Sequence, residues 1–128
     1  MSVVASMAVV ALTAVGCSKD VGPAAWYLDP DHPVPTAQST EIHVQVQEQA
    51  CNNGEPIGDR LIGPDVSEAR DEVVITFSAE RRSGANNCFG LVGADPVTVT
   101  LSAPLGDRRL VDGGTDPPRQ VVPSTSVP

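Results

Sequence analysis

The chain has 128 residues, with 8 Lys and Arg against 16 Asp and Glu, so its net charge at neutral pH is -8. This length accommodates one small domain. An acidic chain in which no segment concentrates Lys and Arg is repelled by phosphate backbones, which excludes nucleic-acid binding by electrostatic attraction. Aromatic residues make up only 3% of the chain, which argues against stacking surfaces for bases or sugars.

The first 16 residues carry no charged side chain, and every charged residue of the chain follows Cys17. A short apolar segment of this kind is typical of the hydrophobic region of an export signal. It is shorter than the roughly 20 predominantly apolar residues that a membrane span requires. We therefore predict that residues 1–16 are a cleaved signal peptide.

The segment from Leu12 to Cys17 reads Leu-Thr-Ala-Val-Gly-Cys and resembles a bacterial lipobox. The resemblance implies that Cys17 becomes the first residue of the mature protein and carries a diacylglyceryl group on its sulfur. Two acyl chains hold a protein stably at a membrane surface. The expected location is therefore the extracytoplasmic face of the cell membrane, with an ordinary secretion signal or an uncleaved anchor as the alternatives.

Apart from Cys17, the chain has two cysteines, Cys51 and Cys88, both in polar segments rich in Asn and Gly. A buried structural thiol is not expected in such surroundings, and an oxidising compartment favours a disulfide between the two. In the chain-entropy model, closing a loop of this size adds roughly 3–4 kcal/mol to the free energy of unfolding.

Residues 17–40 contain four prolines among small and polar residues. This composition predicts an extended tether that holds the domain off the membrane surface. Trp26 and Tyr27 interrupt the tether. We expect them either to contact the domain or the lipid headgroups, or to anchor a partner.

From residue 41 onward, apolar and polar residues alternate as in half-buried strands. The pattern is strongest at 42–46, 73–79 and 97–101 and weaker at 61–68 and 108–111, and Gly63-Pro64 marks the segment 61–68 as an edge strand. The fold class predicted is all-β: a small antiparallel β-sandwich or open barrel of about five strands over residues 41–113. Residues 114–128 hold no recognisable element, and we predict a disordered tail.

The candidates for a base at neutral pH are His32 and His43. His43 falls on the polar side of a predicted strand, where an exposed pair with a carboxylate is the ordinary expectation. The chain has no Gly-x-Ser-x-Gly, Ser-x-x-Lys or His-Glu-x-x-His motif. We therefore predict no catalytic residue. An enzyme or an enzyme inhibitor would require His43 to lie beside a Ser, a Thr or a carboxylate in a concave pocket.

One faint candidate for a metal site is the group Asp29, Asp31 and His32. Calcium and zinc sites need further ligands, so a solvated tether is the preferred interpretation. We expect neither a metal nor a cofactor.

Two pairs of arginines, Arg81-Arg82 and Arg108-Arg109, could grip an anion. Charged side chains at strand ends also deter association of sheet edges, and this is the favoured interpretation of both pairs. Contact with an anion through Arg81 and Arg82 is kept as the alternative.

The segments 71–78, 87–88, 96–101 and 103–113 include Leu-Gly-Asp-Arg at 105–108 and Leu-Val-Asp-Gly at 110–113. Together they resemble a recurrent pattern in small, uncharacterised lipoproteins of high-GC Gram-positive (actinobacterial) bacteria. The resemblance implies a turn into a last strand and a second turn out of it, and it brings no catalytic residue.

The predicted function is that of an exported, lipid-anchored cell-envelope protein that acts as a non-catalytic binding or structural module. Its expected partners are the membrane, through the lipid on Cys17, and a cell-envelope protein or an anionic ligand. The alternatives are a small-ligand or anion-binding lipoprotein and, with less support, an enzyme inhibitor or a hydrolase.

Overall fold

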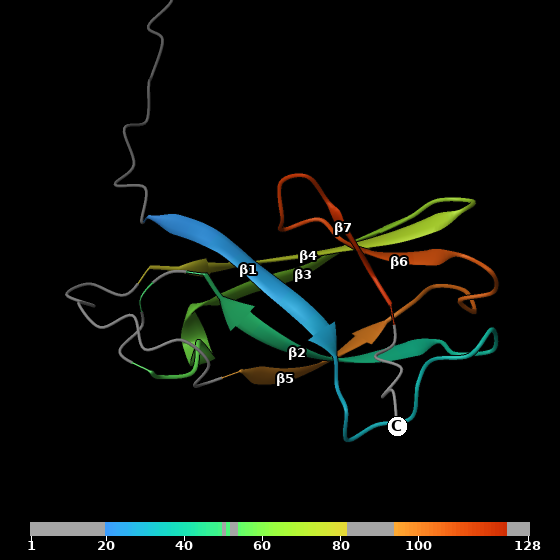
Figure 1. Ribbon diagram of the computed structural model, residues 1–128, viewed down its shortest axis with the longest axis horizontal. Coiled ribbons are helices and arrows are strands. Elements are labelled where there is room, and N and C mark those ends of the chain that lie inside the picture. Colours follow the sequence, from blue (N-terminus) through green and yellow to red (C-terminus); the bar gives the residue numbers. More distant parts are fainter. Residues whose placement is uncertain (1–19, 50, 52–53, 82–93, 123–128) are drawn as a thin grey trace, which may run out of the picture.

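The computed structural model describes residues 20–49, 51, 54–81 and 94–122. This part of the chain is mostly β (Figure 1). Its elements are β1 (Val21–Leu28), β2 (Glu41–Glu48), the 3-10 helix η1 (Gly58–Arg60), β3 (Leu61–Glu68), β4 (Glu72–Glu80), β5 (Asp95–Thr100), β6 (Arg109–Asp112) and β7 (Arg119–Val121). The predicted all-β class is confirmed.

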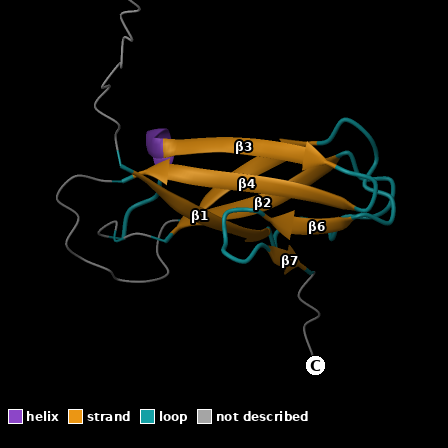
Figure 2. Ribbon diagram, turned by 90° about the horizontal axis from the view of Figure 1, so that it is seen from above, coloured by secondary structure: helices purple, strands orange, loops and turns teal. Residues whose placement is uncertain are grey.

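The strands form one mixed sheet in the order β5-β2-β1-β4-β6-β7, which does not close into a barrel. β3 pairs with the remaining edge of β4, and Figure 2 shows these two long strands running side by side. Neighbouring strands are antiparallel except β4 and β6, which run parallel. The prediction of about five antiparallel strands is corrected to seven in the described residues, because β1 and β7 lie outside the segment in which strands were expected.

β4 divides one of its edges between two partners. β1 pairs with its second half, as far as Ala24 opposite Phe77, and β6 pairs with its first half, as far as Asp112 opposite Ile75. β3 follows the other edge over nearly the whole length of β4. β1 and β6 therefore leave the same edge of β4 in different directions. We call the opening between β1 and β6 the fork.

The expected tether is wrong over residues 21–28, which form an inner strand between β2 and β4. Ala24 and Trp26 are fully buried on its core side. Pro23 does not interrupt the pairing with β2, because the register between these strands begins at Ala24. The carbonyl of Pro23 still accepts a hydrogen bond from the N–H of Gln49 at 3.2 Å, so only the donor that proline lacks is missing at this end of the strand.

The expected disordered tail is likewise corrected, because residues 119–121 form β7 against β6. Val121 is buried in the core, which gives this short strand an apolar contact beyond its pairing. Residues 123–128 lie outside the described part of the chain. The prediction of an edge strand at 61–68 is confirmed, since β3 pairs with β4 alone and its register shifts between Ile62 and Asp65.

The core lies on one face of the coiled sheet, where every second residue of β1, β2 and β4 points inward. Its largest fully buried side chains include Trp26, Phe77, Ile42 and Ile75. The indole Nε1 of Trp26 donates a hydrogen bond to the carbonyl of Ile75 at 2.8 Å. This bond fixes the side chain of the single tryptophan, which comes from β1, against the backbone of β4.

Candidate functional site

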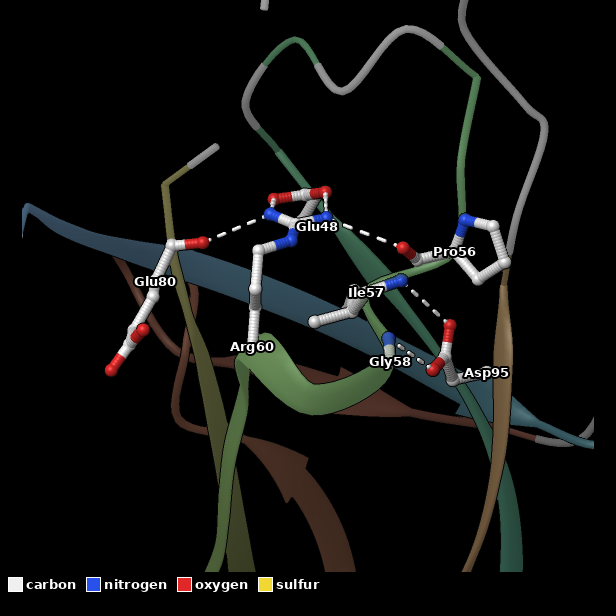
Figure 3. A network of polar contacts seen from close by, with 7 residues as sticks. All are labelled: Glu48, Pro56, Ile57, Gly58, Arg60, Glu80 and Asp95. Carbon is white, nitrogen blue, oxygen red and sulfur yellow. Dashed lines mark hydrogen bonds and ion pairs between the residues drawn. The ribbon is translucent and has the colours of Figure 1, made fainter. Parts of the chain in front are cut away.

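One polar cluster surrounds Arg60 at the end of the sheet where β1 begins (Figure 3). Two guanidinium nitrogens of Arg60 donate to the carboxylate of Glu48 at 2.6 and 2.9 Å, and further bonds reach the carbonyls of Glu80 and Pro56. The side chain of Glu48 is only 2% exposed. The hydrogen bond with Glu48 raises the pKa of Arg60.

Asp95 completes the same cluster from β5. Its carboxylate accepts hydrogen bonds from the backbone N–H groups of Ile57 and Gly58, both at 2.9 Å. These contacts fasten the connection between β2 and β3 onto the sheet. Because the donors and acceptors are used within the protein, we assign this cluster a structural role.

A second tie joins β3 to the loop before β6. Glu68 accepts hydrogen bonds from the hydroxyl and the backbone N–H of Ser102 and forms an ion pair with Arg108 at 3.2 Å. The Ser102 hydroxyl, the Ser102 N–H and Arg108 lower the pKa of Glu68, in that order of effect. Arg108 is therefore a structural residue rather than a free anion contact.

Asp112 is fully buried at the fork between β1 and β6. Its carboxylate accepts from the N–H of Trp26 at 3.1 Å and from the N–H of Gly114 at 2.8 Å. Arg119 lies 3.5 Å from the same carboxylate and donates to the carbonyl of Trp26 at 2.8 Å. On the edge of β1 that faces away from β2, the side chains of Asp112 and Arg119 thus take the place of a neighbouring strand for the backbone of Trp26.

A groove of about 460 Å³ opens beside this fork, where the end of β1, the connection to β2 and the end of β7 meet. It is lined by Tyr27, Leu28, Asp29, Pro30, His32, Pro33, Val34, Pro35, His43, Arg119, Val121 and Val122. Five large apolar side chains are exposed in the described residues, and three of them, Tyr27 at 43%, Val34 at 55% and Val122 at 64%, border this groove. Solvent-exposed apolar side chains that gather at one concave site mark a binding surface.

Two histidines meet at the wall of the groove. The rings of His32 and His43 stack, with centroids 3.9 Å apart and planes inclined by 11°. The Nδ1 atom of His43 lies 3.1 Å from the hydroxyl of Thr98, its partner in the β2–β5 register. The expected pair of His43 with a carboxylate is thus wrong, because its cross-strand neighbour is a threonine.

The group Asp29, Asp31 and His32 is not a solvated tether, because the carboxylate of Asp29 is 6% exposed. That carboxylate accepts hydrogen bonds from the backbone of Asp31 and from the side chain of Gln45, at 2.9 and 3.0 Å. The described residues hold no group of three or more His, Cys, Asp and Glu that could bind a metal ion. Stacked imidazoles also direct their nitrogen lone pairs in nearly parallel planes, which do not converge on one ion.

Charge around the groove is uneven. The arginines that line it or the hollow beside it are paired: Arg119 with Asp112, Arg108 with Glu68, and Arg109 with Glu72. Three carboxylates of the same region have no ion-pair partner among the described residues, namely those of Asp31, Glu41 and Asp107. We refer to these three carboxylates, which lie beside the groove, as its acidic rim.

The remaining predicted site residues are only partly in view. Arg81 is exposed at the end of β4, where its backbone N–H donates to the carbonyl of Asp20. Cys51 is half-buried and is not a free thiol. Cys17, Arg82 and Cys88 lie outside the described residues, so the lipidation, the Cys51–Cys88 disulfide and the anion contact stay predictions.

No protein-family model, curated protein or solved structure matches this chain. The resemblance to small actinobacterial lipoproteins therefore stays a prediction, and a functional assignment rests on geometry. Within the described residues, no helix has the length and apolar character needed to cross a membrane.

Sequence reasoning identified His32 and His43 but missed the apolar rim of the groove. Val34 was read as part of a tether and Val122 as part of a tail. Tyr27 was singled out as an aromatic that could anchor a partner, and it is exposed in the groove, whereas Trp26 belongs to the core. A local signal was available in β1, where the alternation of Gly22, Ala24 and Trp26 already separates these two aromatics onto opposite faces.

Proposed function

We propose that this protein is an exported, lipid-anchored module of the cell envelope that acts by binding, without catalysis, through the groove beside the fork. The observation that carries the proposal is the gathering of three exposed apolar side chains, Tyr27, Val34 and Val122, around one concave site. The signal-like segment 1–16 and the lipobox-like residues that end at Cys17 support the location on the extracytoplasmic face of the membrane.

Anchorage at Cys17 would keep the domain close to the membrane. β1 begins at Val21, and covalent geometry limits the four residues from Cys17 to a reach of about 14 Å. β1 then extends over eight residues, or about 23 Å, to the groove at Leu28. The strand therefore works as a rigid spacer that sets the binding surface away from the point of anchorage (Figure 1).

The surroundings of His43 support binding rather than catalysis, although the histidine does lie beside a threonine and lines a concave site. A nucleophilic hydroxyl requires a base that a third group orients. Among the described residues, the ring of His43 contacts the hydroxyl of Thr98 and is otherwise covered by the ring of His32. A hydroxyl beside a histidine across two paired strands is an ordinary sheet contact.

Metabolic labelling with a fatty acid tests the anchor. The full-length protein should incorporate the label and the Cys17→Ala variant should not; equal labelling of both would contradict lipidation at this residue.

Mass spectrometry of the exported protein without reduction should show Cys51 joined to Cys88, and two free thiols would argue against an oxidising location.

Photochemical cross-linking in intact cells tests the binding surface. p-Benzoylphenylalanine replaces Val122 in the groove in one variant and Ile62 in the other, an exposed side chain on β3 that does not line the groove. We expect a cross-linked product from position 122 alone. Absence of a product at position 122, or equal products at both positions, would contradict binding through the groove.

A further inference from the structure

The edge of β1 that faces the fork has no paired strand at its last residues within the described part of the chain, and these residues lie at the groove. Alternate residues of a strand direct their backbone groups to the same side. The N–H of Asp29 donates to the carbonyl of His43 in β2, so the backbone groups of Trp26 and Leu28 face the opposite side, toward the fork.

The ladder on that side of β1 is completed by side chains only as far as Trp26. Its N–H and carbonyl bond to the side chains of Asp112 and Arg119. Leu28 follows on the same edge, and the register with β4 has already ended at Ala24, so the backbone groups of Leu28 have no partner strand within the part of the chain that the structure describes. Leu28 lines the groove. A free strand edge that meets a cavity is a template for the addition of an extended peptide.

The rim of the groove defines which peptide fits. An extended chain presents alternate side chains to one side, where Tyr27, Val34 and Val122 offer apolar contact. The volume of about 460 Å³ lies within the range of about 300–1,000 Å³ that is typical of ligand sites.

Charge decides between basic and acidic partners. Asp31 lies between Pro30 and His32, which line the groove, and Asp107 lines the hollow beside it; neither carboxylate has an ion-pair partner among the described residues, whereas Arg119 is held by Asp112. An acidic rim attracts Lys and Arg and repels a negatively charged peptide or membrane surface.

We propose that the groove binds an extended basic peptide segment, which pairs with the backbone of Leu28, places an apolar side chain among Tyr27, Val34 and Val122, and directs Lys or Arg to the acidic rim. This inference rests on the proposed binding function and names the class of partner. Main-chain pairing supplies affinity, and the apolar and acidic contacts supply selectivity.

Fluorescence anisotropy with synthetic peptides tests the proposal. Fluorescein-labelled Lys-Val-Lys-Val-Lys-Val is titrated with the full-length protein in a nonionic detergent. We expect saturable binding that weakens by about tenfold or more when Glu replaces Lys, and by a similar factor when the central amides are N-methylated. No saturable binding of the basic peptide, or equal binding of the acidic one, would overturn the proposal.

Matched variants locate the site. The double variant Val34→Thr, Val122→Thr keeps the side-chain shapes and should bind the peptide about tenfold more weakly. Val21→Thr changes a similarly exposed valine at the opposite end of β1 and should bind normally. Equal affinities of the two variants would refute binding in the groove. If the cross-link at position 122 forms in cells but no basic peptide binds, the peptide inference fails and the binding function stands.

Discussion

Replacing Asp112 with alanine tests whether two side chains truly stand in for a strand at the fork. Asp112 is fully buried and accepts hydrogen bonds from the N–H groups of Trp26 and Gly114. Asp112→Ala leaves the buried N–H of Trp26 and the part-buried N–H of Gly114 without an acceptor. It also removes the partner of Arg119, but that side chain is 49% exposed and can return to water.

The expected cost follows from these contacts. A buried donor without an acceptor costs about 1–3 kcal/mol. The N–H of Trp26 carries this cost in full and the part-buried N–H of Gly114 carries less, so the total is roughly 2–4 kcal/mol. We take about 3 kcal/mol as the expected loss, a large part of the 5–15 kcal/mol that is typical of a folded domain. Asp112→Asn keeps one acceptor oxygen and should lose about half as much.

Urea unfolding followed by the fluorescence of Trp26 measures this loss. Trp26 is the single tryptophan of the chain and is fully buried, so its emission reports on the fork directly. With an m-value of about 1.5 kcal/mol per molar urea, a loss of 3 kcal/mol lowers the midpoint by about 2 M. Asp107→Ala, at an exposed carboxylate, should shift the free energy of unfolding by less than about 0.5 kcal/mol. A loss below 1 kcal/mol for Asp112→Ala would refute the strand-replacement argument.

Three further substitutions have defined outcomes. Glu68→Gln should lower the free energy of unfolding at neutral pH and make it fall less on acidification. The lowered pKa of Glu68 stabilises the fold above the ordinary glutamate range, and this contribution is lost as the pH falls through the folded-state pKa. Urea midpoints from pH 7 to pH 3 measure the difference. Gly114→Ala should cost about 1–3 kcal/mol in urea unfolding, since a Cβ would lie 2.8 Å from the carbonyl of Ala24. Arg60→Ala should cost about 2–4 kcal/mol in the same assay, because it leaves the carboxylate of Glu48 buried without its cation.

Each of these substitutions has a control. Glu41→Gln changes a glutamate that has no ion pair among the described residues and should lower stability at neutral pH by less than Glu68→Gln does. Gly22→Ala brings a Cβ against only the flexible side chain of Arg81 and should be tolerated better than Gly114→Ala. Arg70→Ala removes an exposed arginine and should have little effect. Equal effects of a substitution and its control would contradict the contact assigned to that residue.

The strands at 42–46, 73–79 and 97–101 could be predicted from sequence because a period of two is a local signal. The first two lie within β2 and β4, and the third overlaps β5 as far as Thr100. β1 was missed because Pro23 suggests an irregular segment, while its position at the end of the ladder with β2 is a property of the register. β7 is three residues long with one buried side chain, too short for a pattern.

The groove could not be predicted because it depends on which strands are neighbours. Tyr27 and Val122 belong to opposite ends of the chain and meet only because β1 and β6 share one edge of β4. The contact between His43 and Thr98 likewise needs the pairing of β2 with β5. The sequence identifies the histidines as candidate functional side chains, but the residues that they contact depend on which strands are neighbours.

The backbone of β1 is completed by side chains from β6 and β7, and this constrains when the protein can fold. The contacts of Trp26 with Asp112 and Arg119 join residues separated by 86 and 93 positions. A growing chain therefore leaves the backbone of β1 open at Trp26 until Asp112 and Arg119 have been synthesised. Contacts this distant in sequence also slow folding.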